Sequence, residues 1–283
     1  MKKAWITTDC TCDLSEELLE TNDIEVIHFY IHTEFGCFKD RAELTSNNIV
    51  EYFEQGGKQV RTSAPDTEEY IRFFTRMLKK HDEIIHITIS SELSMSYQNA
   101  VAAAKQFPGK VHVFDTGHLS TGIAHFLFRA IDLLKNETPT DMVLQELECL
   151  KKQVSSSFIV YNADYLYRAG RVNKSVKTFC TMFHIHPVLH MKNGKLKLKT
   201  IKIGNYEASI LSYVRSELRN SKRLCKERLF VTHSTCPVKI LSKIYDKAKM
   251  YCAFDEVIET KASATITSNC GANAVGLLYV RKK

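Results

Sequence analysis

Residues 84–107 read IIHITISSELSMSYQNAVAAAKQF and contain three local patterns in succession. The β-branched run at 84–89 predicts a buried strand. A hydroxyl-rich loop follows it and leads into residues 94–107, which predict a helix. A strand that is followed by a helix is the unit from which a mainly parallel sheet, covered by helices on both faces, is built.

The same unit repeats throughout residues 1–155. We expect strands at 4–8, 24–31 and 111–114, and helices at 45–55, 66–80, 119–134 and 140–154, with Ser15 capping a further short helix. The first half is therefore predicted to be an α/β domain whose mainly parallel sheet is flanked by helices.

The second half has a different pattern. Two β runs at 185–191 and 195–202 are joined by Lys192-Asn193-Gly194, and Asn-Gly between β runs is a strong hairpin signal. Around them we expect helices at 164–170, 175–183, 206–219 and 238–250 and strands at 229–233, 257–260 and 274–280. Residues 156–283 are thus predicted to form an α+β domain with a mixed sheet, and a ligand cleft is expected between the two domains.

Charge is divided unequally between the halves of this 283-residue chain. Residues 1–150 contain 14 Lys and Arg against 24 Asp and Glu, whereas residues 151–283 contain 25 against 8. Such asymmetry is typical of a basic half that meets an anionic partner, such as nucleic acid, a membrane surface or an acidic protein face. Docking of two oppositely charged domains on each other explains it equally well.

Cysteine usage and hydropathy indicate the compartment. The nine cysteines are scattered and odd in number, which favours reduced thiols in a cytoplasmic protein. The close pair Cys10-Thr11-Cys12 has no second pair to complete a zinc site, so we expect no metal. The lysines of MKKAWITTDC precede no apolar run, and residues 119–134 are too short and too interrupted to span a bilayer. We therefore expect neither a signal peptide nor stable membrane insertion.

Three hydroxyl-rich loops stand where a strand ends and a helix begins, at residues 8–13, 62–66 and 90–97. A helix N-terminus offers unpaired N–H groups and partial positive charge, so hydroxyls there can hold an anion. Ligands of open α/β sheets bind at the carboxyl ends of the strands, where these loops would gather.

Helix capping alone is a competing interpretation of these loops. Ser63 and Asp66 match an S-x-x-D capping box, and either Ser91 or Ser94 could simply cap the helix that follows.

The spacing of the three loops resembles the DegV family. The motifs on which the resemblance rests are T-D-x-T-x-D-L from Thr8, T-S-x-P from Thr62, and S-S-x-L-S-x-[ST]-Y-Q-x-A from Ser90 to Ala100. Further matches follow in the same order as far as a glycine-rich terminal motif, so the resemblance covers essentially the whole chain: Asp115-Thr116, Tyr165-Leu166, Gly170-Arg171, Pro187-Val188 and Gly271.

This resemblance implies a protein that encloses a long-chain fatty acid between two domains and needs no other cofactor. The carboxylate would be held by Thr62 and Ser94, with secondary contacts from Ser63, Ser96 and Asn269. Similar bacterial proteins present the bound acid to a separate fatty acid kinase, so we expect a monomeric carrier in lipid metabolism that is not itself an enzyme.

The resemblance also implies a basic surface on which the kinase would dock. We assign to it Arg168, Arg171, Lys174, Lys199 and Lys202. Four departures from the family pattern lie near these sites, and one of them is His186, which stands where the family has a lysine before the proline. Met95-Ser96 replaces the usual Gly-Thr, Ile203-Gly204 replaces Arg-Gly, and Asn269 stands where the terminal motif has histidine.

Two other functions are compatible with the residues. A hydrolase or another enzyme could use the hydroxyl-rich cleft, with Ser94, His118 and Asp115 as a Ser–His–Asp site. Nucleic-acid binding could use the basic half, although no helix-turn-helix, zinc-finger or RNA-binding motif accompanies the charge. Neither a P-loop nor a dinucleotide-binding fingerprint is present.

Overall fold

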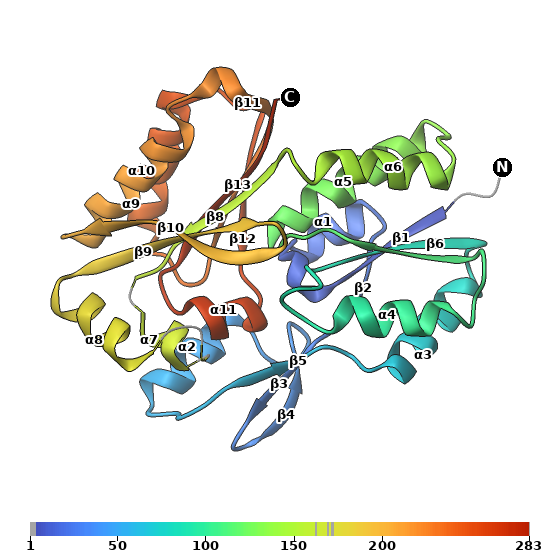
Figure 1. Ribbon diagram of the computed structural model, residues 1–283, viewed down its shortest axis with the longest axis horizontal. Coiled ribbons are helices and arrows are strands. Elements are labelled where there is room, and N and C mark those ends of the chain that lie inside the picture. The colour runs from blue at the N-terminus through green and yellow to red at the C-terminus, as the bar shows by residue number, and fades with distance from the viewer. Residues whose placement is uncertain (1–3, 162, 169, 171–172, 283) are drawn as a thin grey trace.

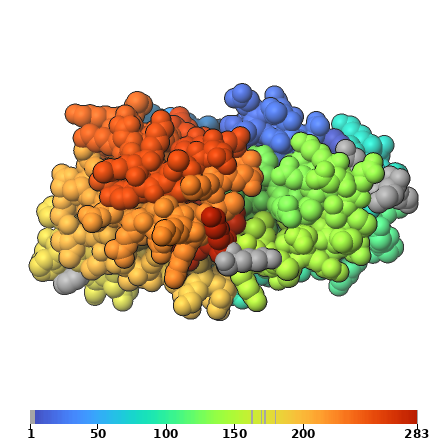
Figure 2. Space-filling model, turned by 90° about the horizontal axis from the view of Figure 1, so that it is seen from above, coloured from blue at the N-terminus to red at the C-terminus, as the bar shows by residue number. Residues whose placement is uncertain are grey.

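The protein has two α/β halves that lie side by side and share a long interface (Figures 1 and 2). The structure is a computed structural model, and it describes residues 4–161, 163–168, 170 and 173–282. None of the helices formed by these residues is long and apolar enough to cross a membrane.

The N-terminal half is built on a four-stranded parallel sheet, as predicted. Its order is β2 (Glu25–Ile27), β1 (Ala4–Asp9), β6 (Glu83–Thr88) and β7 (Val111–Asp115). Helices α3 (Thr67–Leu78) and α4 (Ser96–Ala104) cover one face, and α1 (Glu16–Thr21), α5 (Thr121–Lys135) and α6 (Thr140–Leu150) lie on the other (Figure 1). The short helix η1 (Cys10–Cys12) follows β1 directly.

The expected single strand at 24–31 was wrong, because the chain leaves the parallel sheet after β2. At the break the N–H of Phe29 donates to Cys10 Sγ (3.2 Å) and the N–H of Asp40 donates to the carbonyl of Phe29 (2.8 Å). The chain then enters a small antiparallel sheet that the sequence did not reveal. This sheet consists of β4 (Gly36–Lys39), β3 (Tyr30–Thr33) and β5 (Arg61–Ser63), and α2 (Ser46–Glu54) lies between β4 and β5 in the chain.

The C-terminal half is built on a six-stranded mixed sheet, which confirms the predicted fold class. Its order is β10 (Lys195–Ile203), β9 (Ile185–Lys192), β8 (Val154–Ile159), β13 (Val275–Arg281), β11 (Leu224–His233) and β12 (Glu256–Lys261). Helices α9 (Tyr206–Leu218) and α10 (Val238–Tyr251) cover one face, while α7 (Asp164–Arg168), α8 (Lys174–Met182) and α11 (Ala264–Cys270) lie on the other (Figure 1). The short helix η2 (Ser221–Arg223) links α9 to β11.

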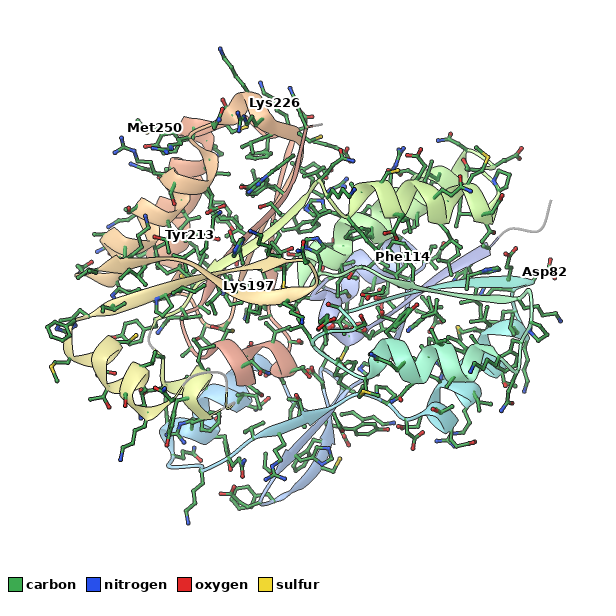
Figure 3. The ribbon with its side chains drawn as sticks, in the orientation of Figure 1. Asp82, Phe114, Lys197, Tyr213, Lys226 and Met250 are labelled. Atoms are coloured by element: carbon green, nitrogen blue, oxygen red, sulfur yellow. The ribbon has the colours of Figure 1, made fainter. Side chains whose placement is uncertain are left out.

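The two faces of this sheet belong to different cores. Leu229, Val231 and Leu277 pack against α9 and α10. Tyr213 of α9, labelled in Figure 3, donates its hydroxyl to the carbonyl of Ser157 (2.7 Å). Phe230 and its partner on β13, Leu278, point the opposite way and join the core of the N-terminal half. Because side chains alternate along a strand, one sheet can close its own core and also form the interface.

The junction between the halves runs through β8. The helix expected at 140–154 ends at Leu150, and β8 begins at Val154. The domain boundary that we placed within Ser155-Ser156-Ser157 therefore lies inside this strand. The Ser156 hydroxyl is 2.9 Å from Nδ1 of His118, and a Cβ at Gly122 would collide with Ser156 Oγ. Glycine at this position therefore lets α5 approach β8 closely.

Helix α11, which the sequence analysis missed, is fixed by two carboxylates of the other half. Asp13 accepts the Ser263 N–H (2.8 Å), and Asp40 accepts the N–H groups of Ala264 and Thr265 (both 2.9 Å). These N–H groups have no partner within the helix, and its N-terminus carries partial positive charge. Two buried carboxylates therefore satisfy the start of α11.

Asp13 makes the stability of the folded protein depend on pH. Burial raises the pKa of Asp13 to about 7, although hydrogen bonds from Ser120 and Ser263 oppose the shift. Between about pH 4 and pH 7 the folded protein keeps a proton that the unfolded chain releases, so the Asp13 contribution to the free energy of unfolding falls as pH rises and levels off above that window.

We expect Asp13→Asn to remove this pH-dependent component, since asparagine tolerates the positive φ of 55° at this position. The difference in unfolding free energy, wild type minus variant, should fall by up to about 1.4 kcal/mol per pH unit across the window. Urea unfolding at a series of pH values measures it, and a difference that is constant with pH contradicts the assignment.

Candidate functional site

A cavity of about 570 Å³ lies between the two halves, a volume typical of sites for small organic ligands. Its polar lining comes from β5, from the loop between β6 and α4, and from α11. The residues that line it are Phe29, Thr62, Ser63, Ala64, Ile89, Ser91, Glu92, Leu93, Ser94, Met95, Leu119, Phe158, Leu166, Leu196, Thr265, Ile266, Asn269 and Cys270.

The structure brings together four of the five predicted contact residues. Thr62 is half-buried on β5, directly opposite Ile31 of β3, and Ser63 follows it. Ser94 lies in the loop that precedes α4, and Asn269 lies near the end of α11. All four line the same cavity although they are separated by up to about two hundred positions in the chain.

The Ser94 hydroxyl lines the cavity and keeps its own hydrogen available for donation. Its oxygen accepts the backbone N–H of Ser96 (3.2 Å), so this N–H occupies one side of the oxygen. The hydroxyl hydrogen is left for a group within the cavity. A hydroxyl held in this way suits an anionic or carbonyl oxygen.

Ser96 does not line the cavity, and our expectation that it would contact a ligand is corrected. It is fully buried, and its hydroxyl donates to Asp9 Oδ2 (3.2 Å) and lies 2.8 Å from the Tyr70 hydroxyl. Asp9 also accepts the N–H of Ile89 (2.9 Å), and burial raises the pKa of this carboxyl group. Ser96 therefore ties the start of α4 to the end of β1.

The two other contact residues hold partners of their own. Nε2 of His32 lies 2.8 Å from the Ser63 hydroxyl, and Nδ2 of Asn269 donates to the carbonyl of Thr265 (2.9 Å). Asn269 is therefore fixed against its own helix where it lines the cavity.

The tip of the β9–β10 hairpin covers the loop that carries Ser94. Ser90 donates to the carbonyl of Gly194 (2.7 Å), and Lys195 pairs with Glu92 at 3.3 Å. A Cβ at Gly194 would lie 3.1 Å from Ser90 Oγ, and its φ of +74° also favours glycine. Among the described residues that line the cavity none is Lys, Arg or His, so the side-chain donors in this lining are neutral.

The apolar lining from the second half was missed by the sequence analysis. Phe158, Leu196, Ile266 and Cys270 come from β8, β10 and α11. Alternation along a strand indicates which residues share a face but not which face meets the other half. Residues 122–128 of α5 are buried in the core of the N-terminal half and do not line the cavity.

Arg168, expected on a docking surface, contacts the N-terminal half instead. Its guanidinium donates to the carbonyls of Gly57 (3.3 Å) and Lys58 (3.1 Å) and lies 5.0 Å from the ring centroid of Phe53. Arg171 lies outside the described residues. Arg168 therefore closes one edge of the interface between α7 and α2.

The predicted basic residues do not form one surface. Lys199 pairs with Glu217 (2.5 Å) and Lys202 donates to Ser212 (3.1 Å), so both point toward α9. Lys174 begins α8 on the opposite face of the sheet (Figure 1). The sequence showed the density of lysines but not the face of the sheet on which each one lies.

The alternative Ser–His–Asp site is not assembled. Nδ1 of His118 lies 2.9 Å from Ser156 Oγ and its Nε2 lies 3.3 Å from the carbonyl of Lys151, while burial lowers the histidine pKa to about 4. Asp115 accepts the Ser91 hydroxyl (2.5 Å). His118 and Asp115 thus serve the loop and the interface rather than Ser94.

No group of three or more His, Cys, Asp or Glu side chains among the described residues is arranged to hold a metal. Cys10 and Cys12 are buried, and Cys10 lies 3.6 Å from Asp40 Oδ2. Burial raises the pKa of Cys12 to about 12, which disfavours the thiolate that metals require.

A model of the family described as "Uncharacterised protein, DegV family" matches residues 3–282. The chain belongs to the DegV family. It is 27% identical over 286 residues to a DegV domain-containing protein of Staphylococcus aureus (strain COL), with 100% of both chains covered. It is 26% identical over 279 residues to a fatty acid-binding protein of Thermotoga maritima, covering 97% of this chain and 96% of that protein.

The fold is shared with solved DegV structures. A DegV family protein from Thermus thermophilus, described by its fatty acid binding, superimposes with a TM-score of 0.86 at 26% identity. The superposition covers 99% of this chain and 100% of that one. The two-half architecture of this protein is therefore the architecture of the family.

The different roles of Ser94 and Ser96 can be tested by comparing the free energies of unfolding of their alanine variants. Ser96→Ala removes a donor from the buried Asp9 carboxyl group and should lower the free energy of unfolding by about 1–3 kcal/mol. Ser94→Ala removes a half-buried hydroxyl at the cavity and should cost clearly less. Chemical denaturation of both variants without lipid measures the difference, and equal losses contradict the separation of roles.

Proposed function

We propose that this protein binds a long-chain fatty acid in the cavity between its halves, with the carboxylate at Thr62 and Ser94. One observation carries the proposal: the cavity combines hydroxyl donors from β5 and the Ser94 loop with apolar side chains from the other half. Ser63 and Asn269 would supply secondary contacts. Relatives of similar length in the same family are described as fatty acid-binding, which supports it.

The energetics suit a carrier. An acyl chain gains about 0.8 kcal/mol per buried methylene group, whereas a neutral hydrogen bond contributes a net ~1 kcal/mol. The tail therefore supplies most of the affinity, and the hydroxyls orient the head. Because no lysine, arginine or histidine lies among the described lining residues, the carboxylate is not locked into an ion pair within the cavity.

Lipid that copurifies with the recombinant protein tests the ligand. We expect mass spectrometry of an organic extract to detect a long-chain fatty acid in near-stoichiometric amount, because the apolar lining is shielded from water in the loaded state. An extract free of lipid, together with no uptake of labelled palmitate or oleate, would exclude this function.

The positions of the head-group contacts are tested by comparing an acid with its alcohol. Thr62→Val and Ser94→Ala should each weaken palmitate binding by about two- to tenfold, the value of one hydrogen bond, and should weaken hexadecanol binding much less. Ser91→Ala is a matched control, since Ser91 also lines the cavity but donates to Asp115. If all three variants change palmitate and hexadecanol binding to the same extent, the assignment of the carboxylate to Thr62 and Ser94 is wrong.

We further propose that the bound acid is presented to a separate fatty acid kinase. Neutral donors leave a carboxylate oxygen able to accept a phosphoryl group, and the excess of Lys and Arg in residues 151–283 favours an acidic docking partner. Lys199 is paired with Glu217, Lys202 donates to Ser212, and Arg168 is held against the N-terminal half, so Lys174 and Arg171 are the remaining candidates.

Charge reversal tests this docking surface. Lys174→Glu and Arg171→Glu should lower acyl phosphate formation by a cognate kinase several-fold at low salt, and less as salt screens charges beyond about 8–10 Å. Lys239→Glu on α10, far from the cavity, is the control, and lipid loading should be unchanged in all three. Turnover equal to wild type across salt concentrations would rule out docking at this surface.

A further inference from the structure

Both ends of the loop that carries Ser94 are attached to one buried carboxylate. Oδ2 of Asp9 accepts the N–H of Ile89 (2.9 Å), which follows the last residue of β6. The same oxygen accepts the hydroxyl of Ser96 (3.2 Å), the first residue of α4. The chain therefore leaves and returns to a single carboxylate oxygen. Asp9 itself is fully buried and is not among the described residues that line the cavity.

The hydrogen bonds around Asp9 have a fixed direction. Its other oxygen, Oδ1, accepts the N–H of Thr11 (3.1 Å) and the Thr11 hydroxyl. Four donors therefore surround one carboxyl group, which matches the lone pairs of an ionised carboxylate. Burial raises the pKa of Asp9, and these hydrogen bonds oppose the shift. Because the Ser96 hydroxyl hydrogen is committed to Asp9, the Tyr70 hydroxyl, which lies 2.8 Å from Ser96 Oγ, is the donor in that contact.

The residue that Asp9 anchors also contacts Ser94. The backbone N–H of Ser96 donates to Ser94 Oγ (3.2 Å), which occupies one lone pair of that oxygen and leaves the Ser94 hydrogen for another acceptor. Since the Ser96 side chain is held by Asp9, the position of this N–H is set by the buried carboxylate. A donor that is ordered before binding loses little conformational entropy when a ligand arrives.

A different carboxylate holds the middle of the loop. Asp115 accepts the N–H of Ser91 (3.2 Å) and the Ser91 hydroxyl (2.5 Å), together with the N–H of Gly117 (2.8 Å). These contacts involve neither Ser94 nor Ser96. Of the two carboxylates that bind this loop, Asp9 is therefore the one whose contacts lead to Ser94.

We propose that Asp9, acting through Ser96, is the positioning residue for the contact between Ser94 and the ligand carboxylate. This inference rests on the proposed fatty-acid-binding function. Asp9 does not touch the ligand, but it fixes the N–H that orients the Ser94 hydroxyl. A hydrogen bond to an ionised acceptor is stronger than one to a neutral acceptor. Loss of this orientation therefore weakens binding of a fatty acid more than binding of the corresponding alcohol.

A double-mutant cycle tests this role, with lipid-free full-length protein and the dissociation constants of palmitate and hexadecanol. Ser96→Ala cuts the contact with Asp9 but keeps the backbone N–H. It should weaken palmitate binding about two- to fivefold, and no more than Ser94→Ala does, because an effect that acts through Ser94 cannot exceed the value of its hydrogen bond. In the Ser94→Ala background it should cause no further loss. Hexadecanol binding should change much less in each case.

Thr11→Val is the matched control, because Thr11 also donates a buried hydroxyl to the Asp9 carboxylate, but to the oxygen that Ser96 does not contact. It should lower the free energy of unfolding as Ser96→Ala does, and it should leave the ratio of palmitate to hexadecanol affinity as in wild type. Thermal unfolding checks that each variant folds. Ser96→Cys, which keeps the size of the side chain but donates only weakly, is the second variant and should give the same pattern as Ser96→Ala.

The possible outcomes separate this inference from the proposed function. A loss of palmitate affinity in Ser96→Ala that is the same with and without the Ser94 hydroxyl, or that Thr11→Val reproduces, overturns the inference, and fatty acid binding stands. If Ser94→Ala itself leaves palmitate binding unchanged, the head-group assignment and the inference are both wrong. A wild-type protein that binds no palmitate overturns the proposed function itself.

Discussion

The cavity depends on the attachment of α11 to the N-terminal half. This seven-residue helix contributes Thr265, Ile266, Asn269 and Cys270 to the lining, but it is too short to be stable alone. Asp13 and Asp40 hold its first N–H groups, and the Ser46 hydroxyl donates to the carbonyl of Ala262 (2.7 Å) just before it. A carboxylate at a helix N-terminus is an anion site that the protein fills with its own side chain. The wall formed by the second half is thereby positioned by the first.

The same physics explains why similar hydroxyl-rich loops have different roles. The loop after β1 supplies Asp13 to α11 and so takes part in assembly, whereas the loops at Thr62 and Ser94 remain open to the cavity. Within one loop, Ser94 lines the cavity while Ser96, two residues later, is fully buried against Asp9. Both residues are serines, so the residue type does not separate these roles. The direction in which each side chain points at the start of α4 does.

The charge of the second half is only partly available to a partner. Lys199 compensates the nearly buried Glu217, and Lys195 joins the halves by pairing with Glu92. The main interface is nevertheless apolar, with Phe230 and Leu278 packed among residues of α5. The unequal division of charge had two explanations, attraction between the halves and an anionic partner. Attraction between the halves accounts for individual contacts, and an anionic partner remains a proposal.

Local sequence was sufficient for the alternating elements of the first half, the Asn-Gly hairpin and the mixed sheet, because periodicity and turn residues are local properties. The family resemblance also singled out Thr62, Ser63, Ser94 and Asn269, which line one cavity, while their contact with a ligand stays a prediction. Tertiary structure alone decided the break after Ile27, the docking of α11 and the burial of Ser96. Each of these depends on a contact between distant parts of the chain, such as Cys10 with Phe29 or Asp13 with Ser263. A residue's spacing can indicate that it has a partner, but only the folded chain determines which one.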